Sequence, residues 1–415
     1  MANKAQGPWT VIASGVEAPP PDVVLRPSRI APAVWKSVLW AVVLSRLFFA
    51  EAAMLAYIYL PHAWVEAPPG VLPPAGGLAY RVLVELWSHW DGLWYLSIAH
   101  LGYRGRPTAT AFFPLYPALV HLFGGTPLAA VTVSMAAMAV AFWLFFRLAA
   151  WEIGLGAAWY ATLALAFFPT AFYINAAYSE SLFLALALGC LYLARLGRYW
   201  MAGAVGAVAC LDSSYGLLLT PVVLWLAWRQ GQGGRWRWLA PLAIPAGLVG
   251  WMAYLVPLFG DPMVFERAQS NWGRHFSWIP LTLAEGLADG WRHLGTGLSW
   301  QALFAQGPPS VTPMVFYNAL FAVFAVAVWA LSLRRLPAYA SLYAGLALAV
   351  PLSYPAEGDP LMSMPRLVLE AFPLFWGLGA MLADAPRWGR RLYFGLSLVL
   401  GALFVALFAT AHWVA

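Results

Sequence analysis

The stretch from residue 86 to residue 117 holds the side chains that are best suited to chemistry. It reads LWSHWDGLWYLSIAHLGYRGRPTATAFFPLYP, so that one acid, Asp91, lies among histidines, arginines and a dense run of aromatic rings. A carboxylate placed among rings loses hydration and becomes a better proton acceptor near neutral pH. Aromatic faces also offer platforms for a sugar ring. The stretch therefore predicts general-base chemistry on a sugar-like substrate.

The spacing of these residues suggests how they are held. If residues 80–100 form one helix at the membrane interface, then Trp87, Trp94 and Tyr95 lie on the face that carries Asp91. An alternative interpretation is an aromatic belt at the membrane surface, in which Asp91 caps or turns the chain. Both interpretations place the stretch beside a membrane.

Composition identifies the kind of fold that must position this stretch. Of the 415 residues, 62% are hydrophobic and 10% are charged, where soluble domains have about 25% charged residues. A water-soluble fold is excluded, and we expect an all-α, polytopic integral membrane protein. The net charge of +6 is explained by the bias that orients membrane proteins and does not imply nucleic acid as a partner.

Apolar runs predict about eleven transmembrane helices within a single membrane domain, residues 35–415, preceded by a disordered cytoplasmic tail, residues 1–34. The predicted spans are 35–60, 126–149, 154–172, 178–194, 200–212, 215–228, 238–258, 311–333, 337–352, 365–383 and 391–411. Two connections, 61–125 and 259–310, are longer than turns require, which suggests that they have a function.

The distribution of Lys and Arg predicts the orientation. With the N-terminus inside, 15 of the 23 Lys and Arg residues lie in inner segments and 7 in outer segments, while Arg46 falls within the first span. This bias matches the positive-inside rule. Both long connections then lie outside, so any chemistry is expected at the outer face. Arg46 itself needs hydrogen-bond partners on other helices.

Several motifs resemble one family of enzymes. The segments HWDG at 89–92, FFPLYP at 112–117, FFPT at 167–170, AYSESLF at 177–183, MPR at 364–366 and AFPLF at 371–375 occur in that family's order. Together they resemble the phosphatidylinositol-glycan mannosyltransferase II family and its bacterial relatives. The resemblance covers most of the chain, from about residue 86 to residue 375.

The resemblance implies the GT-C architecture and a glycosyltransferase, with mannose as the expected sugar. Such enzymes use a polyprenyl-phosphate-sugar donor and an essential acid in the first outer loop, which Asp91 matches. The acceptor would be a glycolipid or another extracytoplasmic glycan, and transfer would invert the anomeric centre, with Asp91 as general base. The expected location is the bacterial inner membrane, with the active site on the extracytoplasmic side. The residues that we expect to bind substrate are His89, Trp90, Trp94, Tyr95, Arg104, Tyr116, Asn175, Tyr178, Glu180 and Arg366.

The sequence departs from the family's pattern at one place. Relatives tend to have a Thr-Arg pair before a Gly-Leu-Leu run, whereas this chain reads LDSSYGLL at 211–218, with Asp212, Ser213 and Ser214 in that position. A cation expected near the lipid phosphate is therefore missing, and Arg366, Arg104 or Arg106 are the candidates to replace it. A catalytically inactive homologue thus stays open as a possible interpretation.

Glu180 and Arg366 each have two possible roles. Glu180 suits either a helix cap or a ligand contact, and Arg366 suits either an interfacial anchor or a bidentate phosphate contact. For the whole chain, a membrane transporter or glycolipid flippase is the competing functional class. The histidines show no HxxxH or HExxH spacing, so no metal ligands are predicted. No cofactor is certain, and a divalent cation stays open.

Overall fold

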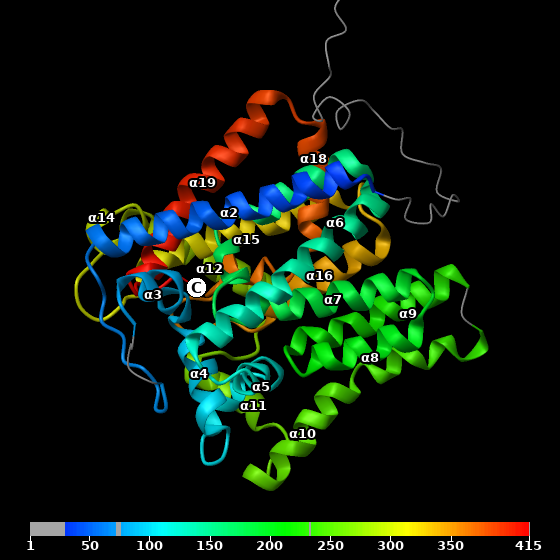
Figure 1. Ribbon diagram of the computed structural model, residues 1–415, viewed down its shortest axis with the longest axis horizontal. Coiled ribbons are helices and arrows are strands. Elements are labelled where there is room, and N and C mark those ends of the chain that lie inside the picture. Colours follow the sequence, from blue (N-terminus) through cyan, green and yellow to red (C-terminus); the bar gives the residue numbers. More distant parts are fainter. Residues whose placement is uncertain (1–29, 72–75, 232–233, 415) are drawn as a thin grey trace, which may run out of the picture.

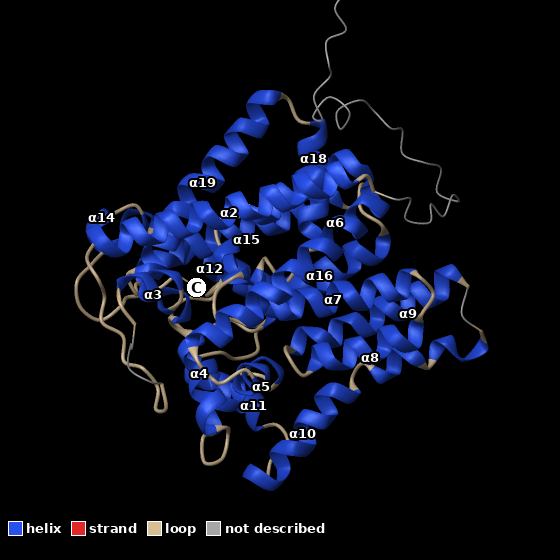
Figure 2. Ribbon diagram, viewed as in Figure 1, coloured by secondary structure: helices blue, strands red, loops and turns tan. Residues whose placement is uncertain are grey.

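The computed structural model describes residues 30–71, 76–231 and 234–414, and within these ranges the protein is helical (Figure 2). No β-strand occurs among the described residues, where backbone pairing outside helices is limited to isolated bridges, such as Arg274 with Ala356. A helical chain satisfies its backbone hydrogen bonds within each segment, as an apolar bilayer requires. The predicted all-α class is confirmed.

The helices follow one another along the chain with short turns of 3-10 helix between some of them. The α-helices are α2 Pro32–Tyr59, α3 Leu78–Leu83, α4 Asp91–Leu101, α5 Leu115–Leu122, α6 Pro127–Ala166, α7 Glu180–Arg195, α8 Tyr199–Cys210, α9 Leu219–Gln230, α10 Ala246–Phe259, α11 Val264–Arg267, α12 Ile279–Arg292, α13 Leu294–Gly297, α14 Trp300–Leu303, α15 Thr312–Ser332, α16 Ala338–Ser353, α17 Met364–Leu367, α18 Pro373–Asp384 and α19 Arg387–Ala409. The 3-10 turns are η1 Glu85–Ser88, η2 Pro107–Ala111, η3 Ala171–Ile174, η4 Ser214–Leu218, η5 Arg235–Trp238, η6 Ala240–Ala243 and η7 Ala268–Trp272.

Five helical segments among the described residues are long and apolar enough to cross a membrane, judged by length and composition. They are α2, α6, the segment Trp236–Phe259, α15 and α19. The helices α8 and α16 are apolar but shorter. These properties agree with the helical membrane protein that the composition predicts.

Helix α6 consists of two helices that join at Gly154. The backbone there has φ 80° and ψ 160°, which is not helical. On either side of the break, Phe145 lies 5.9 Å from the Trp376 ring, while the backbone around Ala161 closely approaches Gly379. Residues 145 and 161 would be about 24 Å apart on a straight helix, yet both contact the same turn of α18. The chain therefore reverses at Gly154, where the predicted spans 126–149 and 154–172 meet.

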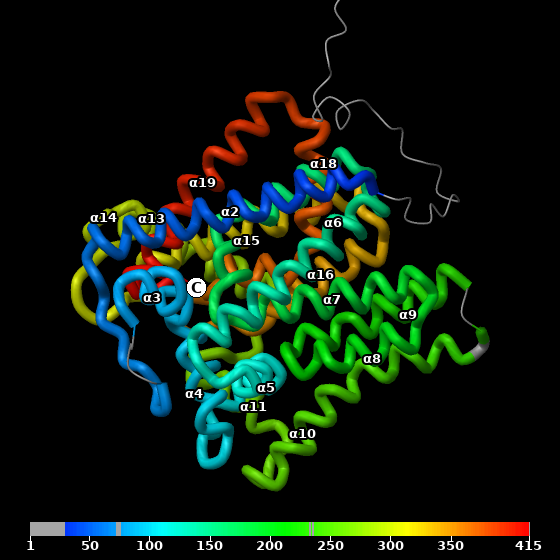
Figure 3. The backbone as a smooth tube through the Cα atoms, viewed as in Figure 1, coloured from blue at the N-terminus to red at the C-terminus, as the bar shows by residue number. Residues whose placement is uncertain are grey.

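The arrangement brings distant segments together (Figure 1). Helix α18 packs against α6, α6 also packs against α7, and α19 packs across α2. Helices α4, α5 and α11 form a separate group below these helices in the view of Figure 1. In the view of Figure 3 the C-terminal end of the chain lies left of centre, near the label of α3, and Trp413 packs against Trp90. Segments far apart in sequence can therefore contribute to one site.

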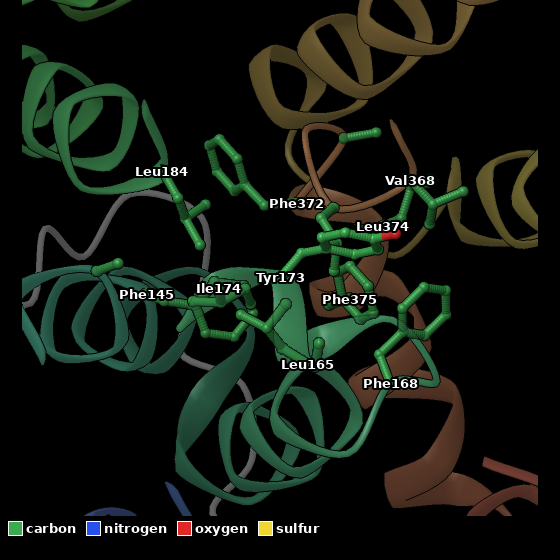
Figure 4. Close-up of a cluster of buried hydrophobic side chains, with 14 of the residues drawn as sticks. Phe145, Leu165, Phe168, Tyr173, Ile174, Leu184, Val368, Phe372, Leu374 and Phe375 are labelled. Atoms are coloured by element: carbon green, nitrogen blue, oxygen red, sulfur yellow. The ribbon is translucent and has the colours of Figure 1, made fainter. Parts of the chain in front are cut away.

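A buried cluster supports the region where these segments meet. Figure 4 shows Phe145 and Leu165 of α6, Leu184 of α7, and Phe372 and Phe375 around the start of α18 directed toward one another. Phe145 and Phe372 have no exposed surface, and Phe375 is almost fully buried. Because packed interiors resist deformation, this cluster gives the neighbouring polar residues a rigid support.

Three local predictions differ from the structure. Residues 80–100 do not form one helix, because the chain turns at Trp90 between η1 and α4, and Trp87 is buried before the turn. The predicted span 365–383 begins with the short helix α17 and a turn, and only Pro373–Asp384 is a continuous helix. Helix α2 begins at Pro32, inside the predicted tail 1–34, whose residues 1–29 lie outside the described residues.

Candidate active site

Three of the motif segments meet at one arginine. Arg366 of α17 donates through Nη1 to Oδ2 of Asp91, the first residue of α4. Its Nε lies 3.4 Å from Oε1 of Glu180, the first residue of α7. The side chains of the three residues are 10–20% exposed. One guanidinium thus connects two carboxylates that are 89 residues apart in sequence.

The backbone around Asp91 is fixed by Tyr178. The Tyr178 hydroxyl donates to the carbonyl of His89 at 2.9 Å and accepts from the Asp91 N–H at 3.2 Å. Gly92 adjoins the same segment, where a Cβ atom would lie 3.3 Å from the Ala177 carbonyl. The glycine of the HWDG motif thus allows close approach to the AYSESLF motif, and the carboxylate is positioned by backbone contacts on both sides.

Two aromatic rings and a hydrogen bond to the preceding residue also hold Arg366 in place. Its guanidinium carbon lies 5.7 Å from the ring centre of Tyr173 and 5.6 Å from that of Tyr178, which is the range of cation–π attraction. The Thr170 hydroxyl donates to the carbonyl of Pro365 at 2.5 Å. The FFPT and MPR motifs are therefore joined directly, and the arginine has little freedom to move.

A cavity of about 160 Å³ lies against this group. Polar side chains and aromatic rings line it together: Asp91, Tyr95, Ala111, Phe112, Gln269, Trp272, Arg274, Met362, Ser363, Arg366 and Trp413. An acid, two arginines and several rings in one hollow suit a ligand that carries hydroxyl groups, apolar ring faces and negative charge.

Unusual backbone conformations surround the cavity. Among the described residues other than glycine, positive φ occurs at Trp90, Ser363 and Ala411. Ser363 lines the cavity itself, Trp90 precedes Asp91, and Ala411 lies two residues before Trp413. Such conformations are costly and concentrate at functional sites. Their positions in and next to the segments that line the cavity make it the candidate functional site.

The predicted aromatic residues divide between the cavity and its support. Tyr95 lines the cavity, and its hydroxyl shares a 2.8 Å hydrogen bond with the Ser179 hydroxyl. Trp94 stacks on Phe112, with ring centres 5.5 Å apart. Trp90 packs edge-on against Trp413 at 4.9 Å. Trp94 and Trp90 thus support two of the rings that line the cavity, Phe112 and Trp413.

His89 has a supporting position. Its Nδ1 lies 2.8 Å from the carbonyl of Phe408, at the end of α19. Burial lowers the pKa of His89, because an apolar environment disfavours the charged ring, although the hydrogen bond to Phe408 acts in the opposite direction. A neutral His89 attached to α19 holds the chain in position ahead of Asp91.

Three other predicted residues lie away from the cavity. Arg104 is exposed and does not line it. Tyr116 is fully buried, and its hydroxyl bonds to the carbonyl of Ala130 and the hydroxyl of Ser134. Asn175 accepts a 2.7 Å hydrogen bond from Arg46. Arg106, considered as a replacement cation, bonds instead to Ser97 and Gly102 at the end of α4.

Arg46 has the cross-helix partners that its position within the first span requires. Besides Asn175, its guanidinium donates to the carbonyls of Ala166 and Ala171, each at 2.7 Å. Arg46 and Asn175 also line a second hollow, an apolar groove of about 610 Å³ between α2 and α6. Trp87, four residues before Asp91, lines the same groove. One wall of the groove therefore comes from the segment that precedes Asp91.

Of the eleven residues that line the cavity, the predicted site residues include only Asp91, Tyr95 and Arg366. Gln269, Trp272 and Arg274 come from the long connection 259–310, and Trp413 comes from the last residues of the chain. The length of the connection was the signal that could have pointed to the first three, but it selects no particular residue. Trp413 lies beyond the last predicted span, where no motif marks it.

A further buried acid, Asp212, is 3% exposed and interacts electrostatically with Glu180. The described residues contain no cluster of three or more His, Cys, Asp or Glu side chains that could hold a metal ion. Asp212 and Glu180 are therefore not part of a recognisable metal centre among the described residues.

Comparisons with known proteins add no assignment. No protein-family model, no curated protein and no solved structure matches this chain. The chemistry of the site must therefore be argued from the side chains that surround the cavity.

Proposed function

We propose that this protein is an integral-membrane glycosyltransferase that moves a sugar from a polyprenyl-phosphate donor to a hydroxyl group of a lipid-linked or other extracytoplasmic acceptor. The observation that carries the proposal is Asp91, an acid fixed by Arg366 and Tyr178 on the wall of a cavity that also contains aromatic rings. An oriented carboxylate is a general base, and rings are sugar platforms. Mannose as the sugar rests on the motif resemblance.

In the proposed reaction Asp91 takes the proton of the acceptor hydroxyl. Arg366 engages Oδ2, so we assign proton transfer to Oδ1. As the proton leaves, the acceptor oxygen attacks the anomeric carbon, the bond from that carbon to the phosphate oxygen breaks, and the polyprenyl phosphate departs as an anion. Attack opposite the leaving group inverts the configuration. A phosphate is a stable leaving group, so one base is sufficient.

Glu180 has a distinct part in this scheme. It shares the guanidinium of Arg366 with Asp91, so that Asp91 is not the sole counter-ion of the arginine. A carboxylate fully engaged by one arginine would be a poor proton acceptor, because a nearby cation favours its charged form. In this proposal Arg366 and Glu180 are positioning residues, which orient Asp91 while they leave it reactive.

The membrane setting completes the proposal. The apolar groove between α2 and α6 suits the hydrocarbon tail of the donor, since its walls are largely aliphatic and aromatic side chains and it begins near Trp87. We further propose the GT-C architecture with about eleven spans and the cavity at the outer face, as the arginine distribution predicts. A donor that stays in the bilayer would then meet an extracytoplasmic acceptor at the cavity.

The proposal is tested by incubating purified protein with labelled polyprenyl-phosphate mannose and a panel of glycolipid acceptors. We expect transfer by the native protein and a loss of about a hundredfold or more in Asp91→Asn, which cannot accept the proton. Glu285→Gln, which changes an exposed acid of the outer connection, is the matched control and should keep the native rate.

The outcomes distinguish the transferase from its competitors. Normal turnover by Asp91→Asn would remove Asp91 from the mechanism. An absence of transfer to every acceptor would reject the transferase proposal. Movement of intact donor across a sealed vesicle membrane, without transfer, would favour the transporter instead.

A further inference from the structure

The two arginines that line the cavity differ in how their charges are balanced. Arg366 is paired with the carboxylates of Asp91 and Glu180. Arg274 lines the same cavity, yet no carboxylate of the described residues lies within ion-pair distance of it. Arg274 interacts electrostatically with Asp359 and Asp91 without forming an ion pair with either. A negatively charged ligand that enters the cavity therefore finds its least neutralised cation at Arg274.

Arg274 is held in place from outside the cavity. Its Nη1 donates to the carbonyl of Tyr354 at 2.9 Å and its Nη2 to the carbonyl of Met362 at 3.3 Å. Its backbone forms a bridge with Ala356, and Gly273, with a positive φ of 65°, makes the turn immediately before it. A guanidinium has five N–H donors, so two bonds to carbonyls leave up to three donors for a ligand.

The position of Arg274 also bears on the cation that the sequence lacks near Ser213. Arg274 interacts electrostatically with Tyr215, which lies at the turn after Ser213. Burial lowers the pKa of Arg274, but an arginine begins so far above neutrality that the group keeps its charge. The guanidinium thus keeps a positive charge that acts on the turn containing Tyr215.

We propose that Arg274 binds the phosphate of a lipid monophosphate in this cavity, while Arg366 serves to position Asp91. The assignment rests on the proposed function for the identity of the lipid, but the anion site itself follows from the unpaired charge. A fixed, planar guanidinium with donors to spare matches the oxygens of a phosphate. This replaces the expectation that Arg366, Arg104 or Arg106 provides the phosphate contact.

The other cations of the region fit this role less well. Arg46 also lacks a carboxylate partner within the described structure, but it lines the apolar groove and its donors go to two carbonyls, Asn175 and Ser45. Arg104 is exposed outside the cavity. Arg274 alone among these three lines the cavity with Asp91.

The test is direct binding, measured by calorimetry on the purified, detergent-solubilised protein. The probe is farnesyl phosphate, a short lipid monophosphate, and uncharged farnesol is the reference. We expect the native protein to prefer the phosphate, and Arg274→Gln to weaken phosphate binding by about tenfold or more with farnesol unchanged. Arg274→Lys should retain part of the preference, because it keeps the charge but loses the planar fork. Arg292→Gln, an exposed arginine of the same outer connection, is the control and should bind normally.

Each of the following outcomes supports or overturns the assignment of phosphate binding to Arg274. If the folded Arg274→Gln protein binds farnesyl phosphate as well as the native protein, the assignment is wrong, even if transferase activity is found. If Arg274→Lys loses as much affinity as Arg274→Gln while both stay folded, charge is not the cause and the assignment also fails. If Arg274→Gln does not fold, the phosphate-to-farnesol ratio of Arg274→Lys decides: a ratio equal to the native one overturns the proposal. Phosphate binding that depends on Arg274 without any sugar transfer would support this site and reject the transferase.

Discussion

The charged group of Arg366, Asp91 and Glu180 gives a quantitative test of the site, because its three members predict unequal costs of mutation. Removing the arginine leaves Asp91 and Glu180 without their shared cation, whereas removing the Asp91 charge leaves Arg366 paired with Glu180. At an effective dielectric constant of about 20, each contact contributes roughly 4 kcal/mol of gross attraction. Desolvation offsets much of this attraction, so the net costs must be smaller.

The structure allows these net costs to be ranked. Breaking a buried ion pair by removing one partner costs about 3–5 kcal/mol, and the partial exposure of these side chains, 16% for Arg366 and 20% for Asp91, favours the lower end. We therefore expect Arg366→Gln to destabilise the fold by about 3 kcal/mol. Asp91→Asn should cost about 1 kcal/mol, because the amide oxygen still accepts a hydrogen bond. The double variant should cost less than the sum by about 1–2 kcal/mol.

The assay is unfolding by SDS in mixed micelles, followed by the fluorescence of the protein's 24 tryptophans. A matched control is the cycle of Arg292→Gln and Asp289→Asn, a pair on α12 in which the arginine is 68% exposed. Exposed pairs of this kind couple by about 0.5 kcal/mol. A coupling for Arg366 and Asp91 no larger than that of the control would refute the pairing on which the site is built.

Three further predictions test other parts of the molecule. Burial raises the pKa of Asp359 to about 6. The folded state therefore binds the proton more tightly than the unfolded chain. The contribution of Asp359 to stability is full below about pH 4 and declines as the pH rises to about 6. Asp359→Asn should remove this decline from the free energy of SDS unfolding measured against pH. Gly379→Ala should lower the free energy of unfolding by about 1–3 kcal/mol, because its Cβ would lie 2.5 Å from a backbone atom of α6. Gly395→Ala is the control: it has open space around it and should be neutral or stabilising by up to about 1 kcal/mol. In a background without the two native cysteines, Glu285→Cys should react with an impermeant thiol reagent in intact cells and Gly389→Cys should not; the reverse pattern would invert the proposed orientation.

The sequence predicts the segments of this site better than it predicts their geometry. The motifs that contain Asp91, Tyr178, Glu180 and Arg366 were selected from residue types and a resemblance, and the structure brings all four into contact. The local sequence pattern was sufficient to select these motifs, because each of them combines a charged or polar residue with aromatic rings and helix-breaking residues. The helical fold is predictable for a simpler reason, since a chain with 62% hydrophobic residues belongs in a bilayer, where helices satisfy the backbone.

What the sequence could not supply are contacts that depend on tertiary structure. Helical periodicity placed Trp87 and Asp91 on one face, but the turn at Trp90, with a φ of 56°, separates them. A tryptophan in that conformation is not predicted by local preference, because it is held by tertiary contacts such as the packing of Trp90 on Trp413 and the hydrogen bond from Tyr178 to His89. Such a conformation becomes visible only in the folded chain.

The same limit explains why Arg274 was overlooked, and it clarifies what distinguishes a binding arginine from a positioning one. Residue type is identical in Arg274 and Arg366, and both line one cavity. The difference lies in their neighbours: two carboxylates balance Arg366, whereas backbone carbonyls hold Arg274 without cancelling its charge. A carboxylate partner uses up the attraction that a phosphate would otherwise gain, while a carbonyl fixes the guanidinium and leaves most of that attraction available. Under the proposed function, the charge balance of each arginine, which no single-sequence motif encodes, therefore separates the residue proposed to orient Asp91 from the residue proposed to bind the phosphate.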